Sequence, residues 1–191
     1  MTIYWGEEMN SHSVRTATLA TAIAVTLLPA IALAANPKDV ARARNVTRMS
    51  ECMKCDLTNA KMTNGFFQLA VMIGADLSGA NFDGANLAGS QLNNVKALKT
   101  SFVYTNFSGA RLDGGDFSGA NFSNAWLNWT WFAGAKLDGA NFKDARMPGA
   151  QLYNTDLSKA LGLTQDQIDK ACGDASTKLP PGLRVPACVV F

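Results

Sequence analysis

The chain has 191 residues, of which 48% are hydrophobic and 17% are charged. This length is sufficient for one domain with a hydrophobic core, and the composition is that of an ordinary globular protein. The formal net charge is +2 and the basic residues are scattered along the sequence, which excludes the clustered basic surface of a nucleic-acid-binding protein.

The first 34 residues have the pattern of an export signal. Arg15 supplies a positive charge, residues 16–35 form an uncharged apolar run, and residues 32–34 read Ala-Leu-Ala, which is an A-x-A cleavage site. Acidic residues near the start are unusual in such a signal and favour translation from Met9. An uncleaved membrane anchor is the alternative, but Pro29 and the small residues favour cleavage. We therefore expect a periplasmic or secreted mature protein with no stable membrane insertion.

Cleavage of this signal also removes His12, the only histidine of the sequence. Without a histidine the mature chain cannot form a Ser-His-Asp or Cys-His nucleophile system, a His-ligated zinc site or a C-x-x-C-H haem attachment. We therefore expect no enzymatic activity, no catalytic residue, no metal and no cofactor.

Residues 55–160 repeat with a period of five, without insertion or deletion. From Leu57 onward every fifth residue is large and apolar, with Ala97 as the exception, and a small residue such as Ala75, Ala120 or Thr130 lies two positions before each. All charged residues of this region avoid both columns. Because burying one unpaired charge costs several kcal/mol, both columns are predicted to point inward and the other three positions outward.

A period of five fits neither an α-helix nor a simple strand. Residues 75–79, Ala-Asp-Leu-Ser-Gly, and 120–124, Ala-Asn-Phe-Ser-Asn, resemble the A(D/N)LxX signature of the pentapeptide-repeat family. The resemblance implies an all-β fold, a right-handed quadrilateral β-helix with four pentapeptides per coil, and about five coils spaced about 4.8 Å apart. Glycine and asparagine then occupy corners whose dihedrals they tolerate, as at Gly79, Gly84, Gly109, Asn124 and Gly139.

The repeat occupies residues 55–161 and needs a cap at each end, because an open coil exposes its apolar interior and its strand edges. The amino-terminal cap, residues 35–54, is expected to pack through Val40, Val46 and Met49, and to cover the apolar outward residues Phe66, Leu69, Val71 and Ile73. In the carboxyl-terminal cap and tail, residues 162–191, Thr164 and Gln167 form a capping box, which predicts a short helix from Thr164 to Cys172.

The four cysteines permit three disulfide pairings. Cys52 and Cys55 lie at the start of the repeat, and Cys172 and Cys188 follow it. The two pairs lie at opposite ends of a stack about 25 Å tall, beyond disulfide reach, so pairing within each end is predicted. Cys52 and Cys55 form a C-x-x-C motif, but a redox function of this motif needs a βαβ context that the sequence lacks. A structural disulfide, or a reduced Cys55 that fills an inward position, is therefore favoured.

Three tryptophans, Trp126, Trp129 and Trp131, fall at outward positions on adjoining faces, and Tyr153 follows one coil later. An exposed aromatic cluster marks an interaction surface or an oligomer contact. The alternative is local stacking: with twenty residues per coil, Trp131 lies above Arg111 and Trp126 below Arg146, which is suitable for cation–π contact.

These observations predict a non-enzymatic binding or structural scaffold in the periplasm or cell envelope, with an unidentified protein or envelope component, or a second copy of the chain, as partner. The alternative is a gyrase-binding DNA mimic, a function known for some members of the family with strongly acidic faces. The acidic and basic residues of the repeat balance, and the export signal points away from the cytoplasm, so no nucleic-acid-like role is expected.

Overall fold

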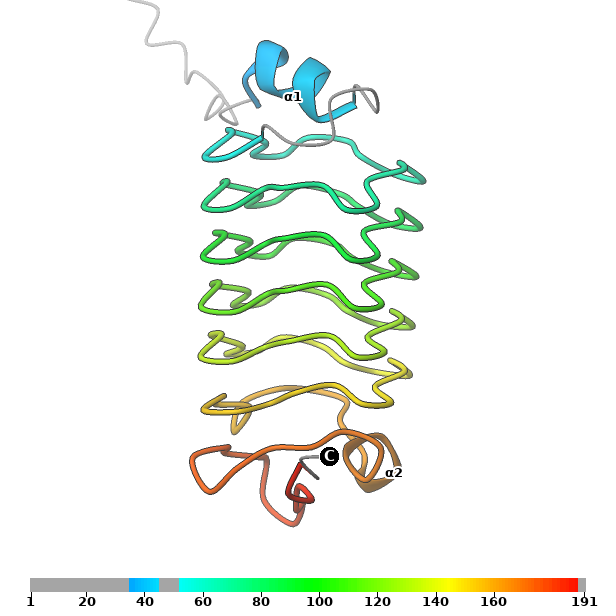
Figure 1. Cartoon of the computed structure of the whole chain (residues 1–191), viewed down its shortest axis with the longest axis vertical. Coiled ribbons are helices and arrows are strands. Elements are labelled where there is room, and N and C mark those ends of the chain that lie inside the picture. Colours follow the sequence, from blue (N-terminus) through cyan, green and yellow to red (C-terminus); the bar gives the residue numbers. More distant parts are fainter. Residues whose placement is uncertain (1–34, 45–51, 189–191) are drawn as a thin grey trace, which may run out of the picture. The chain divides into compact units, whose positions relative to one another are not determined.

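The computed structural model describes residues 35–44 and 52–188. These residues belong to one compact unit, Ile31–Phe191. The predicted export signal, residues 1–34, lies outside the described residues, as do Val46 and Met49. Within the described part, two short helices flank a coil of isolated β-bridges: α1, Pro37–Arg44, and α2, Gln165–Ile168 (Figure 1).

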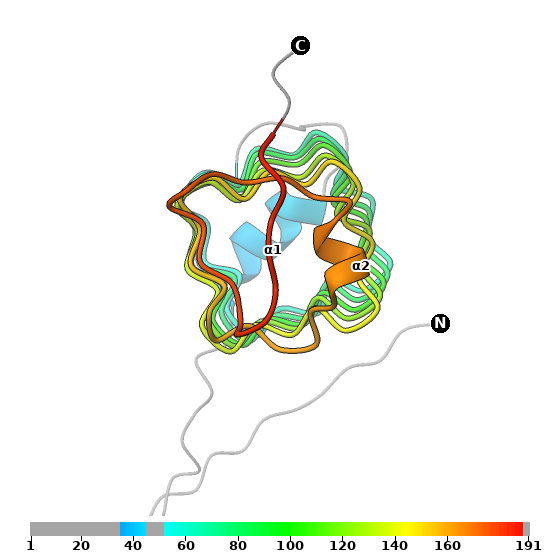
Figure 2. The same cartoon turned by 90° about the horizontal axis from the view of Figure 1, so that it is seen from below.

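Parallel bridges between residues twenty apart hold the coil together. The four ladders begin at Asp56, Lys61, Phe66 and Val71. They define four walls, called walls 1 to 4 in that order, and successive coils superpose when seen along the stack (Figure 2). Wall 1 runs from Asp56 to Asp156 in steps of twenty, which is five full turns. The chain is therefore a four-sided β-helix.

The corners between the walls are tight turns. In each, the residue after a turn donates its N–H to the carbonyl oxygen three residues earlier, as from Ala60 to Leu57 at 3.0 Å. The third turn residue has a positive φ, +68° at Gly79 and +59° at Asn124, which is typical of a type II turn. The predicted corner role of glycine and asparagine is confirmed, because these residues adopt positive φ at the lowest cost.

The two predicted inward columns form the core. Large side chains from Leu57 to Leu157 fill the interior, and Phe82, Phe102, Phe122 and Phe142 stack along wall 2 with centroids of adjacent rings 5.2–5.7 Å apart. Hydroxyl groups in the column of small residues donate hydrogen bonds to backbone carbonyls: the Thr130 hydroxyl donates to the Phe107 carbonyl at 2.9 Å. The interior is thus apolar and its polar side chains are paired.

Helix α1 lies at the amino-terminal end and is tied to the first coil. Asp39 accepts a hydrogen bond from the Asp56 N–H at 3.0 Å, and Val40 and Ala43 pack partly buried against the core. Phe66 and Leu69 nevertheless remain 69% and 60% exposed. The expectation that the amino-terminal segment covers them is therefore wrong, since α1 spans the end of the coil rather than its outer walls (Figure 1).

The carboxyl-terminal end is closed by α2 and by the tail. Helix α2 has four residues, shorter than the span expected from Thr164 to Cys172, and its capping box joins Thr164 and Gln167. The helix is short because the chain returns to the ladder at Cys172, which bridges Gln151. The tail then crosses the end of the coil (Figure 2), with Leu183 and Val185 packed against the core. This end therefore exposes little of the apolar interior.

Candidate functional site: a tryptophan surface

Three tryptophans of one coil form the most distinctive outer feature. Trp126 lies on wall 3, Trp131 on wall 4, and Trp129 at the corner between them. Their exposed fractions are 46%, 38% and 65%. We call Trp126, Trp129 and Trp131 the tryptophan surface. Large exposed indoles at adjoining positions are a feature of interaction sites rather than of solvent-facing walls.

Two arginines cover part of this surface. The Arg111 guanidinium lies 5.4 Å from the centre of the Trp131 ring, and that of Arg146 lies 5.9 Å from the centre of the Trp126 ring. Both pairs are bridge partners one coil apart, as the register of twenty predicts. At exposed positions such contacts contribute about 0.5–1 kcal/mol each. Local stacking therefore occurs, and it leaves each indole substantially exposed.

Trp129 occupies a position that disfavours a bulky residue. Its φ is +56°, in the left-handed region, where a large side chain is strained. The indole lies against Gly149 of the next coil, where any Cβ would collide with the ring, whereas a Cβ at Gly109 of the previous coil would meet no atom within 4 Å. Tyr104 also combines a positive φ with a ring that is 65% exposed, so what distinguishes Trp129 is the presence of two further exposed indoles on the same coil.

The amide of Asn128 adds an unusual polar atom to this surface. Asn128 lies between Trp126 and Trp129 in the sequence, and its Oδ1 is buried without a hydrogen-bond partner among the described residues. An unpaired buried acceptor is destabilising by about 1–3 kcal/mol. Sequence reasoning missed Asn128, because only the structure shows which polar atoms are buried without a hydrogen-bond partner.

Tyr153 is less closely associated with the surface than its position in the sequence suggested. It lies one coil beyond Trp131, partly exposed, and its carbonyl accepts the Gly134 N–H at 3.2 Å. Within residues 52–188 its ring makes no aromatic contact with the three indoles. The structure therefore places Trp126, Trp129 and Trp131 on one coil, on two adjoining walls and the corner between them, and Tyr153 on the following coil.

All four cysteines are paired within their own ends. Cys52 bonds to Cys55, with Cα atoms 5.0 Å apart, and Cys172 bonds to Cys188, with Cα atoms 4.7 Å apart. Cys52 and Cys55 are both buried. The predicted pairing within each end is present, and Cys55 is bonded rather than reduced. Each bond lies beside a cap, where it joins chain outside the repeat to the end of the coil.

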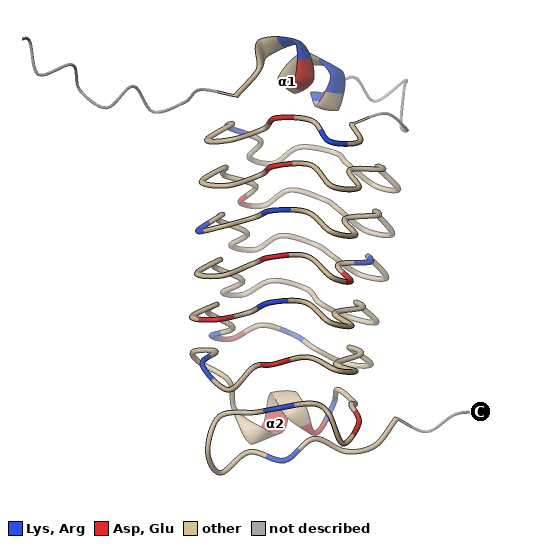
Figure 3. Cartoon of the chain, turned by 90° about the vertical axis from the view of Figure 1, so that its left-hand side faces the viewer, with Lys and Arg blue, Asp and Glu red and all other residues tan. Residues whose placement is uncertain are grey.

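The outer charges form a ladder along wall 1. The first two bridge residues of this wall are aspartates, and from there on lysine and aspartate alternate: Asp56, Asp76, Lys96, Asp116, Lys136, Asp156 and Lys178 (Figure 3). Each lysine pairs with the aspartate one coil earlier, at 3.1 Å for Lys96 and Asp76. Hydrogen bonds from Ser158, followed by the one from Lys178, lower the pKa of Asp156 to about 2. No continuous acidic face results on this wall.

Metal-binding clusters and membrane-spanning helices were looked for in the described residues. Residues 35–44 and 52–188 contain no group of three or more histidine, cysteine, aspartate or glutamate side chains placed to hold a metal ion. In the same ranges no helix is both long and apolar enough to cross a bilayer.

Comparison with known families identifies the repeat. The pentapeptide repeat region model matches residues 66–142, and the model for pentapeptide repeats in eight copies matches residues 127–161. The chain belongs to the pentapeptide repeat family. The matched residues cover the coils of all four walls, including the tryptophan surface, so the surface is part of the repeat itself and not of either cap.

Solved pentapeptide repeat proteins resemble the chain at low identity. One from the cyanobacterium Cyanothece 51142 is 29% identical, with a TM-score of 0.36; the match covers 55% of this chain and 63% of that one, less than two thirds of its length. One from Nostoc PCC 7120 is 19% identical over 79% and 90% of the two chains, with a TM-score of 0.43. One from the thylakoid lumen of Arabidopsis thaliana is 25% identical over 65% and 75%, with a TM-score of 0.29. No curated protein matches the chain significantly.

Proposed function

We propose that this pentapeptide repeat protein is a non-enzymatic binding scaffold of the periplasm or cell envelope, and that the tryptophan surface contacts a protein partner or a second copy of the chain. The observation that carries the proposal is the exposure of Trp126, Trp129 and Trp131 on one coil. Indoles bury a large area at low entropic cost and dominate many interfaces, whereas they contribute nothing to solubility.

The energetics of the surface favour a partner over local stacking alone. Two exposed cation–π contacts offer about 0.5–1 kcal/mol each. Trp129 makes no such contact within the described residues, has a positive φ, and exposes 65% of its surface. Glycine stands at the same corner in other coils, at Gly89, Gly109 and Gly149. Folding alone would be served by glycine, so the indole at position 129 needs a different explanation.

A location outside the cytoplasm is supported by two independent features. The amino-terminal segment carries an A-x-A site after an apolar run. All four cysteines form disulfides, which persist in oxidising compartments and are rare in the cytosol. The non-enzymatic part of the proposal rests on the sequence, whose single histidine lies in the predicted signal. The alternating charges of wall 1 disfavour the gyrase-binding DNA mimic, which needs a continuous acidic face.

The test is a triple variant in which each tryptophan takes the residue found at the same wall position in other coils: Trp126→Asn as at Asn106, Trp129→Gly as at Gly109, and Trp131→Gln as at Gln151. Circular dichroism is expected to show an unchanged fold. Sedimentation of the purified protein, and crosslinking in cell-envelope extract, are expected to lose an oligomer or an adduct that the parent protein forms.

The matched control is Tyr104→Asn, because Tyr104 is also an exposed aromatic residue at a corner, 65% exposed, and asparagine occupies that corner at Asn124. The control is expected to keep the oligomer or the adduct. If the triple variant keeps every species of the parent, or if the control loses the same ones, the tryptophan surface is not the binding surface.

A further inference from the structure

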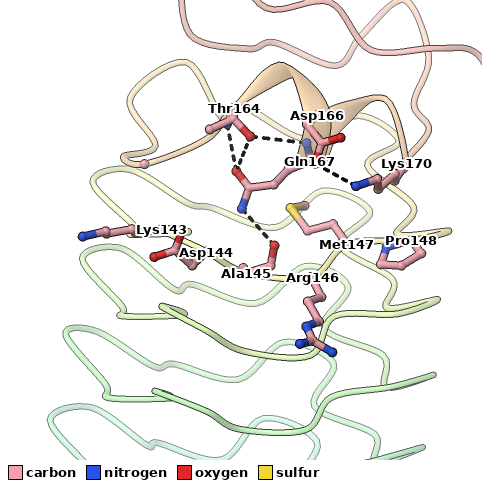
Figure 4. A pocket seen from close by; sticks show the side chains of 11 residues that line it. Lys143, Asp144, Ala145, Arg146, Met147, Pro148, Thr164, Asp166, Gln167 and Lys170 are labelled. Carbon is pink, nitrogen blue, oxygen red and sulfur yellow. Dashed lines mark hydrogen bonds and ion pairs between the residues drawn. The ribbon is translucent and has the colours of Figure 1, made fainter.

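One wall of the coil lacks its last rung. Wall 3 ends at Arg146, which bridges Trp126 and has no bridge on its other side within the described residues. The other three walls continue past that coil, to Leu161, Cys172 and Lys178. Helix α2 takes the place of the missing strand. A helix does not follow the contour of a strand, and a cavity of about 740 Å³ remains between α2 and the wall (Figure 4).

A side chain replaces half of the missing rung. The Gln167 Nε2 donates to the Phe142 carbonyl oxygen at 2.8 Å. It also donates to the Ala145 carbonyl oxygen at 2.9 Å, and the Gln167 Oε1 accepts the Thr164 N–H at 2.8 Å (Figure 4). In a complete coil, a backbone N–H of the next strand donates to the equivalent carbonyl; for example, the Asn81 N–H donates to the Ala60 carbonyl. The acceptors on the wall are therefore satisfied.

The donor on the wall is not satisfied. One coil earlier, the Leu127 N–H donates to the Arg146 carbonyl at 2.7 Å. The equivalent group is the Met147 N–H, which makes no hydrogen bond in residues 35–44 and 52–188. Met147 is 1% exposed and lines the cavity. No group of the described residues satisfies this N–H, so an acceptor that enters the cavity can pair with it.

The charges around the cavity favour an anion with a single charge. Lys170 pairs with Asp166 at 2.7 Å. Lys143, Asp144 and Arg146 also line the cavity and make no ion pair within the described residues, which leaves one net positive charge. The Arg146 side chain is exposed and stacks on Trp126 with an energy of about 0.5–1 kcal/mol, so it turns toward a stronger partner at little cost.

We infer that the cavity beneath α2 binds a small organic monocarboxylate. One carboxylate oxygen accepts from the Met147 N–H and the other from the Arg146 guanidinium, which gives the charge-assisted geometry that arginine favours. The apolar body of the ligand packs on Ala145, Met147 and Pro148. The cavity volume lies in the usual range for small-molecule sites, about 300–1,000 Å³. None of the three tryptophans lines this cavity, and the only link between the two sites is Arg146, which stacks on Trp126.

The experiment titrates the full mature protein with 3-phenylpropionate by calorimetry and by amide NMR. The neutral matched probe is 3-phenylpropanamide, and inorganic phosphate is the competing anion. We expect millimolar or tighter binding of the carboxylate, binding of the amide weaker by about tenfold, and a shift of the Met147 amide resonance on titration. The absence of carboxylate binding at millimolar concentration, an unmoved Met147 resonance, or equal binding of the amide or of phosphate overturns the inference.

Two matched variants test the role of Arg146. Arg146→Gln and Arg111→Gln both remove a guanidinium that stacks on a tryptophan, and glutamine occupies a bridge position elsewhere at Gln91 and Gln151. Only Arg146 lines the cavity. We expect Arg146→Gln to weaken 3-phenylpropionate binding by about tenfold and Arg111→Gln to leave it unchanged. Equal effects of the two substitutions overturn the assignment. The oligomer assay of the triple tryptophan variant reports separately on the protein contact.

Discussion

Replacing Gln167 with leucine tests whether a single carboxamide closes the carboxyl-terminal coil. Gln167 is buried, and leucine has a similar volume, so the packing is largely preserved. The Ala145 carbonyl and the Thr164 N–H lose their hydrogen-bond partners, whereas the Phe142 carbonyl keeps the bond from the Ala145 N–H at 3.0 Å. Ala145 is buried, so its carbonyl left without a partner costs about 1–3 kcal/mol, whereas Thr164 is exposed and water can solvate its N–H. The free energy of unfolding is therefore expected to fall by about 1–3 kcal/mol.

Urea denaturation followed by far-UV circular dichroism measures this loss. The matched control is Gln151→Leu on the outer side of wall 4, where the side chain of Gln151 makes no hydrogen bond within the described residues. Wall 4 accepts an apolar side chain at the equivalent position of its first rung, Val71. The control is expected to change the free energy of unfolding by less than about 0.5 kcal/mol. A Gln167→Leu protein as stable as the parent would refute the role of the carboxamide as a substitute for the missing rung.

Three further predictions concern the core, the tail and the outer charges. Leu87→Asp places a charge in the apolar interior and is expected to abolish soluble folded protein, whereas Ala88→Asp on the outer wall shifts the free energy of unfolding by less than about 0.5 kcal/mol; equal thermal melts of the two contradict the register. Cys188→Ser opens a disulfide between residues sixteen apart and is expected to cost about 3 kcal/mol, seen as a lower melting temperature that responds less to reductant than that of the parent. Hydrogen bonds from Ser158 lower the pKa of Asp156 from 3.8 to about 2, so the contribution of this carboxylate to stability is present above pH 4 and is lost as the pH falls toward 2. Carboxyl NMR is expected to show a higher pKa for Asp156 in the Ser158→Ala variant. An unchanged pKa excludes the serine hydrogen bonds as the cause.

The sequence was sufficient to predict which residues are inside. A period of five repeats each side-chain direction at fixed intervals, so the columns through Leu57 and Ala75 could be assigned from size and charge alone. The resemblance to the pentapeptide repeat family then supplied the coil of twenty residues. That register placed Trp131 over Arg111, and the structure has this contact at 5.4 Å. These predictions succeed because every coil repeats the same local geometry.

The ends of the coil could not be predicted in the same way. A capping box identified Thr164 and Gln167, but it gave no sign that α2 stops after four residues or that the Gln167 amide reaches back to Ala145. The amino-terminal cap was expected over Phe66, which is exposed. These contacts lie outside the repeat and depend on how two different structures meet.

The sequence by itself determined the repeat, its inward columns and the residues that stand out from it. Only the tertiary structure decided that wall 3 ends one rung early, that the Met147 N–H has no partner in the described part of the chain, and that Trp129 lies against Gly149. The physical reason is that a repeat encodes its own neighbours at a constant separation, whereas a cap is specified by contacts between residues whose separation follows no period.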